Sequence, residues 1–181
     1  MFIVMSGWPY SGKTTFVKLL IEQLKSFHIK PIKLDPTEAY PEDITKLPDR
    51  TQYAVAAWEV ITEEAMRIVS STDNKTVIIL DTTGSNSNVI GPIINQAAIR
   101  KHKTMFVRLN TPIEECKSRA GGNWIDQEAE DKYKDRFNSN VNYLETICHS
   151  SVLIDNSTSG CIESMQIAAR KISKMIRLQA V

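Results

Sequence analysis

The stretch "FIVMSGWPYSGKTTFVKLL", residues 2–20, decides the fold. Residues 2–5 are apolar and predict a short buried strand. The next segment, residues 7–14, reads GWPYSGKT and fits the pattern G-x-x-x-x-G-K-[ST] without a mismatch. Residues 13–27 then place apolar side chains on one stripe, which is typical of an amphipathic helix. A strand, a glycine-bearing loop and a helix in this order predict a phosphate-binding loop (P-loop).

The residue types of this loop suit a bound triphosphate. Its backbone N–H groups must wrap a phosphate, so glycines are needed where a Cβ would clash, and the helix that follows points its positive end at the anion. The lysine supplies charge to the β- and γ-phosphates, and the hydroxyl after it suits Mg²⁺. We therefore expect a nucleoside triphosphate with Mg²⁺, held by Gly7, Ser11, Gly12, Lys13 and Thr14.

The composition of the chain limits the classes of protein to which it can belong. With 181 residues, 24% charged and 42% apolar, the chain is expected to form a single domain, residues 1–181. The net charge of +1 weakens a non-specific DNA-binding interpretation, although it leaves room for a local basic groove. Three cysteines without metal-ligand spacing suggest a reducing compartment. No signal peptide or membrane-spanning run is visible, so we expect a cytoplasmic protein with no membrane partner. The oligomeric state stays open.

Apolar runs and amphipathic stretches alternate along the whole chain. Further strands are predicted at 29–34, 77–80, 104–109 and 152–155. Helices are predicted at 50–69 with Asp49 as N-cap, at 89–100, from 112 to 119, at 126–147 and at 163–178, while 35–49 should be a loop or broken helix. This alternation predicts an α/β fold, a five-stranded parallel sheet sandwiched by helices. Ligands then bind beyond the carboxyl ends of the strands.

Two aspartates stand at such strand ends. Asp81 closes the apolar strand "VIIL" and could hold a metal-bound water beside the P-loop, or cap the next turn. Asp35 follows the strand at 29–34, although an Asp before Pro is as often a turn former. The sequence lacks the N-K-x-D pattern of GTPases, and its small size favours a kinase.

The chain resembles the small P-loop kinases that phosphorylate hydroxyl groups: the polynucleotide 5′-kinase domain, gluconate and shikimate kinases, and adenylylsulfate kinase. The resemblance covers most of the chain. It rests on "GWPYSGKTT" (7–15), the Asp after the second strand, "ILDTTGSN" (79–86), "FVRLNTPIEECKSRAGG" (106–122) and "VLIDNSTS" (152–159). The first motif is highly specific for phosphate binding. Each of the others has low specificity on its own, but together they occur in the expected order.

The resemblance implies a P-loop kinase fold, ATP as the donor and four further roles. Asp35 matches the residue that accepts the proton of the attacking hydroxyl. Arg119 matches a lid arginine that stabilises charge on the transferred phosphoryl group, and Arg136 is a weaker second candidate. Thr15 matches the residue that contacts the α-phosphate. The lid would span about 119–136.

The segment after Asp35 departs from the polynucleotide 5′-kinase pattern. These kinases carry an arginine shortly after the base, whereas residues 36–40 here read PTEAY, and Arg50 is the next arginine. This favours a different placement of the hydroxyl. The pentamer "DTTGS" (81–85) is similar to the phage kinases that phosphorylate 5-hydroxymethyluracil in DNA. The many neutral hydrogen-bonding groups of residues 82–88 suit a hydroxyl-rich or base-like acceptor.

Three functions stay open from the sequence. The favoured one is an ATP-dependent kinase acting on a nucleoside, a nucleotide or a modified DNA base. The second is a small-metabolite kinase of the sugar-acid type. The third is a nucleotide-binding regulatory switch with slow hydrolysis. Among the aromatic residues, Trp8, Tyr10 and Trp124 could form a wall near a ligand, whereas Trp58, in the middle of a helix, is expected in the core.

Overall fold

Five parallel strands form one sheet in the order β2-β3-β1-β4-β5. The computed structural model describes residues 1–39, 50–73, 76–124, 127–157 and 161–179. The strands are β1 (Phe2–Ser6), β2 (Ile32–Leu34), β3 (Ile78–Leu80), β4 (Thr104–Asn110) and β5 (Ser150–Asp155). β1 lies in the middle, with Phe2 in register with Ile78 of β3 and with Thr104 of β4. The predicted α/β fold is confirmed.

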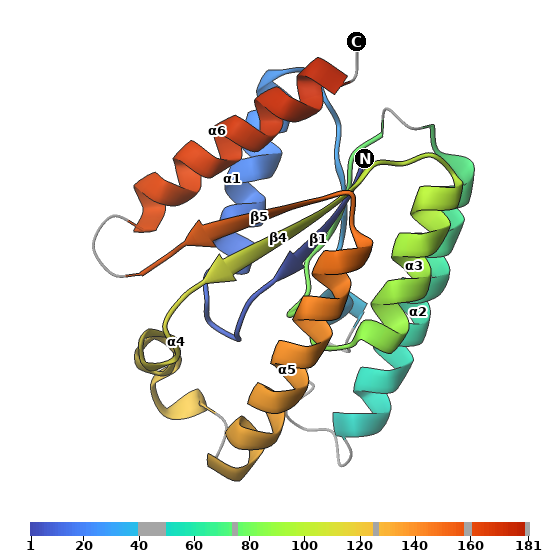
Figure 1. Cartoon of the computed structure of the whole chain (residues 1–181). Helices are drawn as coiled ribbons and strands as arrows, with labels where there is room; N and C mark the ends of the chain where they lie inside the picture. Colours follow the sequence, from blue (N-terminus) through green and yellow to red (C-terminus); the bar gives the residue numbers. More distant parts are fainter. Residues whose placement is uncertain (40–49, 74–75, 125–126, 158–160, 180–181) are drawn as a thin grey trace.

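Helices cover both faces of the sheet (Figure 1). They are α1 (Lys13–Ser26), α2 (Arg50–Ser71), α3 (Ser87–Ile99), α4 (Ile113–Ala120), α5 (Gln127–Ile147) and α6 (Cys161–Gln179). Successive side chains of β1 face opposite sides, because a strand has a period of two. Ile3 and Met5 pack with α1 and α6, whereas Phe2 and Val4 pack with α2, α3 and α5. The wholly apolar central strands therefore follow from burial on both faces.

The parallel strands bring distant segments to one edge of the sheet. The P-loop follows β1, Asp35 follows β2, Asp81 follows β3 and Asn156 follows β5. These residues stand at the carboxyl ends of strands that run in the same direction. Among the described helices, none is both long and apolar enough to cross a membrane.

The second strand is shorter than predicted. It covers Ile32–Leu34 rather than 29–34. The Ile29 N–H donates to the Leu24 carbonyl at 3.0 Å, which closes the end of α1, and His28 adopts a φ of +59° there. These residues therefore complete the helix end instead of pairing with β3.

The predicted loop over 35–49 begins with a short 3₁₀ helix, Pro36–Ala39. The rest of that loop, and with it the predicted N-cap Asp49, lies outside the described residues.

Candidate active site

The P-loop has the backbone that the sequence predicts. Gly12 adopts a φ of +94°, and a Cβ there would stand 2.9 Å from Nδ2 of Asn156. At Gly7 a Cβ would stand 2.6 Å from Oγ of Ser11. Both positions therefore require glycine. α1 begins at Lys13, directly after the loop, so its positive N-terminal end faces the space that the loop encloses. This cradle suits a phosphate group.

Lys13 lies across the loop. Its Nζ donates to the carbonyl of Gly7 at 3.0 Å and to that of Trp8 at 2.7 Å. Burial lowers the pKa of Lys13 to about 8, and the nearby charge of Asp81 opposes the shift. Lys13 is thus a desolvated cation, whose attraction for an anion is stronger than that of a lysine in water.

Asp81 is buried at the end of β3 and is 6% exposed. Its Oδ2 accepts no hydrogen bond from any part of the chain that the structure describes. Burial raises the pKa of Asp81, repulsion from Asp35 adds to the shift, and Lys13 and the Thr14 hydroxyl counteract it. A buried oxygen without a partner beside a hydroxyl fits a hydrated Mg²⁺.

A metal there would depend on few protein ligands. No group of three or more His, Cys, Asp or Glu side chains gathers among the described residues in a way that could hold a metal. Mg²⁺ usually keeps several waters and binds through one or two protein groups together with substrate phosphates. The pair Thr14 and Asp81 fits this mode.

Asp35 is held by its own neighbours. It accepts hydrogen bonds from the Thr37 hydroxyl at 2.6 Å and the Thr37 N–H at 2.9 Å, and pairs with Lys33 at 2.9 Å. Burial opposes ionisation, but the hydrogen bonds from Thr37 and Lys33 outweigh it and hold the pKa of Asp35 below its ordinary value. Asp35 is therefore a fixed carboxylate that can orient a hydroxyl.

Two cavities meet at the P-loop. The first, of about 520 Å³, is lined by Tyr10, Gly12, Lys13, Thr14, Thr15, Arg119, Asn156, Ile162 and Met165. The second, of about 320 Å³, is lined by Lys13, Thr14, Asp35, Pro36, Thr37, Trp58, Asp81, Thr82 and Thr83. Lys13 and Thr14 belong to both. The P-loop thus brings Lys13 and Thr14 to both spaces, with Gly12 and Thr15 in the first and both aspartates in the second, whereas Gly7 and Ser11 line neither.

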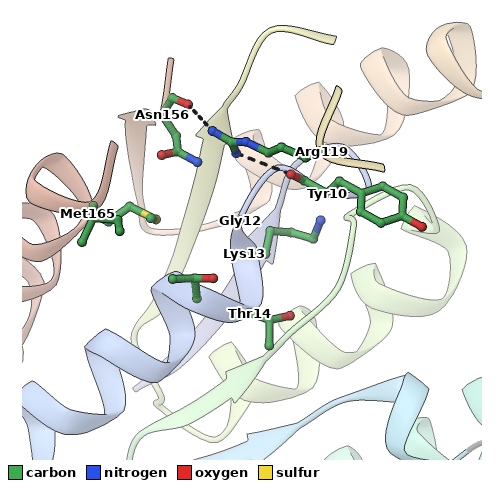
Figure 2. A pocket seen from close by; sticks show the side chains of 9 residues that line it. Tyr10, Gly12, Lys13, Thr14, Arg119, Asn156 and Met165 are labelled. Carbon is green, nitrogen blue, oxygen red and sulfur yellow. Dashed lines mark hydrogen bonds between the residues drawn. The ribbon is translucent and has the colours of Figure 1, made fainter. Parts of the chain in front are cut away.

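Arg119 lies on the side of the first cavity. Figure 2 shows its guanidinium between Tyr10 and Asn156. It donates to the Tyr10 carbonyl at 3.5 Å and to the Asn156 carbonyl at 3.4 Å, and forms an ion pair with Glu115 one turn earlier in α4. Arg119 therefore faces the same cavity as Lys13, from the end of α4.

Arg136 lies elsewhere. It is exposed on α5 and lines neither of the two cavities at the P-loop. It lines a third cavity, between α2, α3 and α5. The geometry therefore separates the two predicted lid arginines.

The aromatic residues of the P-loop contact the segment after α4. The ring centroid of Trp124 lies 6.3 Å from that of Trp8 and 6.2 Å from that of Tyr10. Trp8 also packs on Phe137 of α5, with centroids 5.2 Å apart. Trp124 is fixed by a hydrogen bond from Nε1 to Glu130, at 2.8 Å. The wall expected from Trp8, Tyr10 and Trp124 is formed, with Trp8 half-buried and Tyr10 exposed.

Two residues of the site, Trp58 and Asn156, differ from what the sequence predicts. Trp58, predicted in the core, is half-buried: it packs against the core between the sheet and α2, α3 and α5, and its other side lines the second cavity. Asn156 was given no role, yet it is buried and its Nδ2 donates to the Ser11 carbonyl at 2.6 Å. Its place directly after the last strand is the signal that could have found it.

Comparison with known proteins adds the family. Residues 1–159 match the family of the chromatin associated protein KTI12. The chain belongs to the KTI12 family. Among curated protein sequences, none is significantly similar to it.

Solved structures of this family and of kinases share the fold. Kti12 of Chaetomium thermophilum in complex with ADP-AlF3 has a TM-score of 0.65 at 14% identity, over 97% of this chain and 99% of that one. Shikimate kinase of Acinetobacter baumannii with shikimate has a TM-score of 0.61 at 19% identity, over 98% and 93%. The APS kinase of Mycobacterium tuberculosis, with AMPPNP and APS, has a TM-score of 0.59 at 12% identity, over 97% and 96%.

These likenesses show that this KTI12-family chain has the fold of the P-loop kinases. The resemblance to shikimate and adenylylsulfate (APS) kinases is confirmed at the level of the fold. At these identities the likeness carries neither a substrate nor an activity.

Proposed function

We propose that the protein is an ATP-dependent phosphotransferase that transfers the γ-phosphoryl group to an alcohol hydroxyl. The favoured acceptor is a nucleoside, a nucleotide or a modified DNA base such as 5-hydroxymethyluracil. One observation carries the proposal: Lys13 and Thr14 line both the cavity that suits a nucleotide and the smaller cavity that contains Asp35 and Asp81. A kinase needs such a place for the donor and a place for the acceptor on the two sides of the transferred group.

Each residue of the proposed mechanism has a defined part. Gly7, Ser11 and Gly12 shape the loop that holds the β- and γ-phosphates, and Thr15 faces the α-phosphate. Lys13 and Arg119 stabilise negative charge on the transferred group. Thr14 and Asp81 would hold Mg²⁺, which when bound neutralises phosphate charge. Arg136, expected from the resemblance to assist, lines a different cavity and has a weaker claim.

Asp35 orients the acceptor hydroxyl in this scheme. The hydroxyl oxygen forms a bond to the γ-phosphorus while the bond from that phosphorus to the β–γ bridging oxygen breaks, and ADP leaves. The hydroxyl proton passes to the Asp35 carboxylate. Because its pKa is held low by Thr37 and Lys33, Asp35 acts mainly by holding the hydroxyl in line, with proton transfer late in the reaction.

We further propose that residues 1–181 form a single kinase domain, and that residues 119–136, which run from the end of α4 into α5, close over the nucleotide as a lid. Trp124, in contact with Trp8 and Tyr10, would seal the site against water. The cytoplasmic location expected from the sequence stays a prediction. The description of the family as chromatin associated favours a location near DNA as the alternative.

A nucleotide-dependent regulatory switch is the second candidate. The pairing of Asp35 with Lys33 and Thr37 favours it, since a carboxylate already occupied in this way is a weak base. Such a protein would bind and slowly hydrolyse ATP and report the γ-phosphate to a partner.

The variant Asp35→Asn separates the two candidates. In a kinase it should lower phosphoryl transfer by about 10²-fold or more while ATP affinity is unchanged. The control is Glu38→Gln. It removes the other ion pair of Lys33, in which Nζ lies 2.7 Å from Oε1 of the exposed Glu38, and Glu38 does not line the cavity of Asp35. If Asp35→Asn and Glu38→Gln leave phosphoryl transfer from ATP equally unaffected, the kinase proposal is wrong.

A further inference from the structure

A large groove adjoins the candidate active site. It has a volume of about 800 Å³ and is lined by α2, α3, α5 and the loop after β3, with Trp58, Glu59 and Glu63 on α2 and Arg136 on α5. Figure 1 shows these three helices side by side on one face of the sheet. The volume is in the range of small-molecule sites.

Trp58 joins this groove to the cavity of Asp35. It lines both spaces and packs partly against the core formed by α2, α3 and α5. A second link is the hydrogen bond between the hydroxyls of Thr83 and Ser85, at 2.8 Å, since Thr83 lines the cavity and Ser85 the groove. A molecule bound in the groove could therefore extend a hydroxyl past Trp58 toward Asp35.

The polar wall of the groove is uncharged and held in place. Ser85, Asn86 and Asn88 line it from the loop and the start of α3. Asn140 of α5 fixes this segment: it donates through Nδ2 to the Ser85 carbonyl at 2.5 Å and accepts from the Ser87 hydroxyl at 2.7 Å. A fixed row of hydroxyl and amide groups can recognise the edge of a ring.

The charged groups of the groove disfavour phosphate. Among the described lining residues, Glu59 and Glu63 contribute two carboxylates, against one guanidinium from Arg136. Glu59 and Glu63 stand one helical turn apart on α2, so they present their charges on the same face. A phosphate bound between them would meet repulsion that an uncharged ligand avoids.

We propose that this groove binds the acceptor as an uncharged planar ring that carries a hydroxyl, of the nucleobase or nucleoside type, stacked on Trp58, and that Glu59 and Glu63 exclude phosphate groups from it. The inference rests on the proposed kinase function, because Asp35 must receive the hydroxyl. A free nucleoside and a base turned out of a nucleic-acid strand share this chemistry. The exclusion of phosphate from the groove distinguishes it from a nucleotide-monophosphate site.

A binding experiment tests the role of the groove independently of phosphoryl transfer. The probes are 5-hydroxymethyl-2′-deoxyuridine, its 5′-monophosphate, and a single-stranded oligonucleotide that contains the same base. Each is titrated into the full chain saturated with a non-hydrolysable ATP analogue, and tryptophan fluorescence is followed. The variants are Trp58→Phe and the double variant Glu59→Gln/Glu63→Gln. Tyr143→Phe is the control, since Tyr143 is exposed on α5 and does not line the groove.

We expect the nucleoside to bind about tenfold or more tightly than its monophosphate, and Glu59→Gln/Glu63→Gln to narrow that difference. Trp58→Phe should abolish the quenching of tryptophan fluorescence by the nucleoside, and Tyr143→Phe should keep it. Quenching of Trp58 by the oligonucleotide would identify a strand as the source of the ring, and its absence would identify a free nucleoside.

Three outcomes would overturn the proposal: equal or tighter binding of the monophosphate, quenching that survives in Trp58→Phe, or no binding of any probe. Binding of the nucleoside without transfer of phosphate from ATP would leave the groove assigned and would instead contradict the proposed kinase function.

Discussion

Asn156 donates through Nδ2 to the main-chain carbonyl of Ser11 at 2.6 Å, although 145 residues separate them in the sequence. This bond ties the P-loop to the end of β5. The same Nδ2 would stand 2.9 Å from a Cβ at Gly12, so Asn156 leaves no room for a larger residue at that position. The shape of the P-loop therefore depends on a residue of the last strand end as well as on its own glycines.

Asn156→Ala should destabilise the protein by about 0.5–1.5 kcal/mol, because it removes one of two hydrogen bonds to the Ser11 carbonyl, and the Thr111 hydroxyl still donates to that carbonyl at 2.9 Å. Denaturant unfolding followed by circular dichroism measures the change. Asn95→Ala is the control, since Asn95 is exposed on α3. Equal stability of the two variants would show that the bond contributes nothing to the P-loop.

The lowered pKa of Lys13, about 8, predicts that the affinity of the free protein for ADP falls as pH rises through about 8, because the ammonium loses its charge. Stability should change in the opposite direction. Between about pH 8 and the ordinary lysine pKa near 10.4, the unfolded chain binds a proton that the native state lacks, so unfolding becomes harder as pH rises.

Titration of ADP binding between pH 6.5 and 9.5 measures this effect, with Lys13→Met as the test variant and Lys18→Met, exposed on α1, as the control. Lys13→Met should bind weakly and without this pH dependence. A wild-type pH profile that persists in Lys13→Met would assign the titration to another group.

Asp81→Asn should raise the Mg²⁺ concentration needed for half-maximal ATP turnover by about tenfold or more, since changes to the side chains that hold or orient a metal ion have effects of this size. Asparagine keeps the shape and removes the charge from the buried Oδ2. Thr14→Val should act in the same direction. An unchanged Mg²⁺ requirement in both variants would remove them from the metal site.

The two predicted lid arginines should differ in effect. Arg119→Ala should raise the KM for ATP and lower kcat, since its guanidinium borders the cavity of Lys13. Arg136→Ala should leave the KM for ATP unchanged, because Arg136 lines the groove between α2, α3 and α5 and neither of the two cavities at the P-loop. Steady-state kinetics at varied ATP decide this, and equal effects on the KM for ATP would show that both arginines contact the nucleotide.

Much of the fold could be predicted from the sequence, because its signals are local. The apolar runs of β1 and β3 and the glycines of the P-loop each have one physical interpretation. The position of Asp81 followed from the same rule, that the residue after a buried parallel strand faces the ligand edge.

Other features could not be predicted, because they depend on tertiary packing. Nothing in the sequence near Trp58 indicates that its helix faces the strand ends, and half-burial resembles core burial in a periodic pattern. The separation of Arg119 from Arg136 depends on how α4 and α5 lie against the sheet. The sequence analysis did not predict the ion pair of Asp35 with Lys33, at 2.9 Å, because this contact depends on how the end of β2 and the turn after it fold.

The most direct test of the central claim is phosphoryl transfer from γ-labelled ATP and Mg²⁺ to a panel of acceptors. The panel holds DNA containing 5-hydroxymethyluracil, a 5′-hydroxyl oligonucleotide, free nucleosides and nucleotides, gluconate and shikimate, each with the Lys13→Ala variant as control. We predict label in a nucleoside-type or modified-base acceptor, and none with Lys13→Ala. Label found only in inorganic phosphate, with ATP binding intact, would contradict the kinase and favour the regulatory switch.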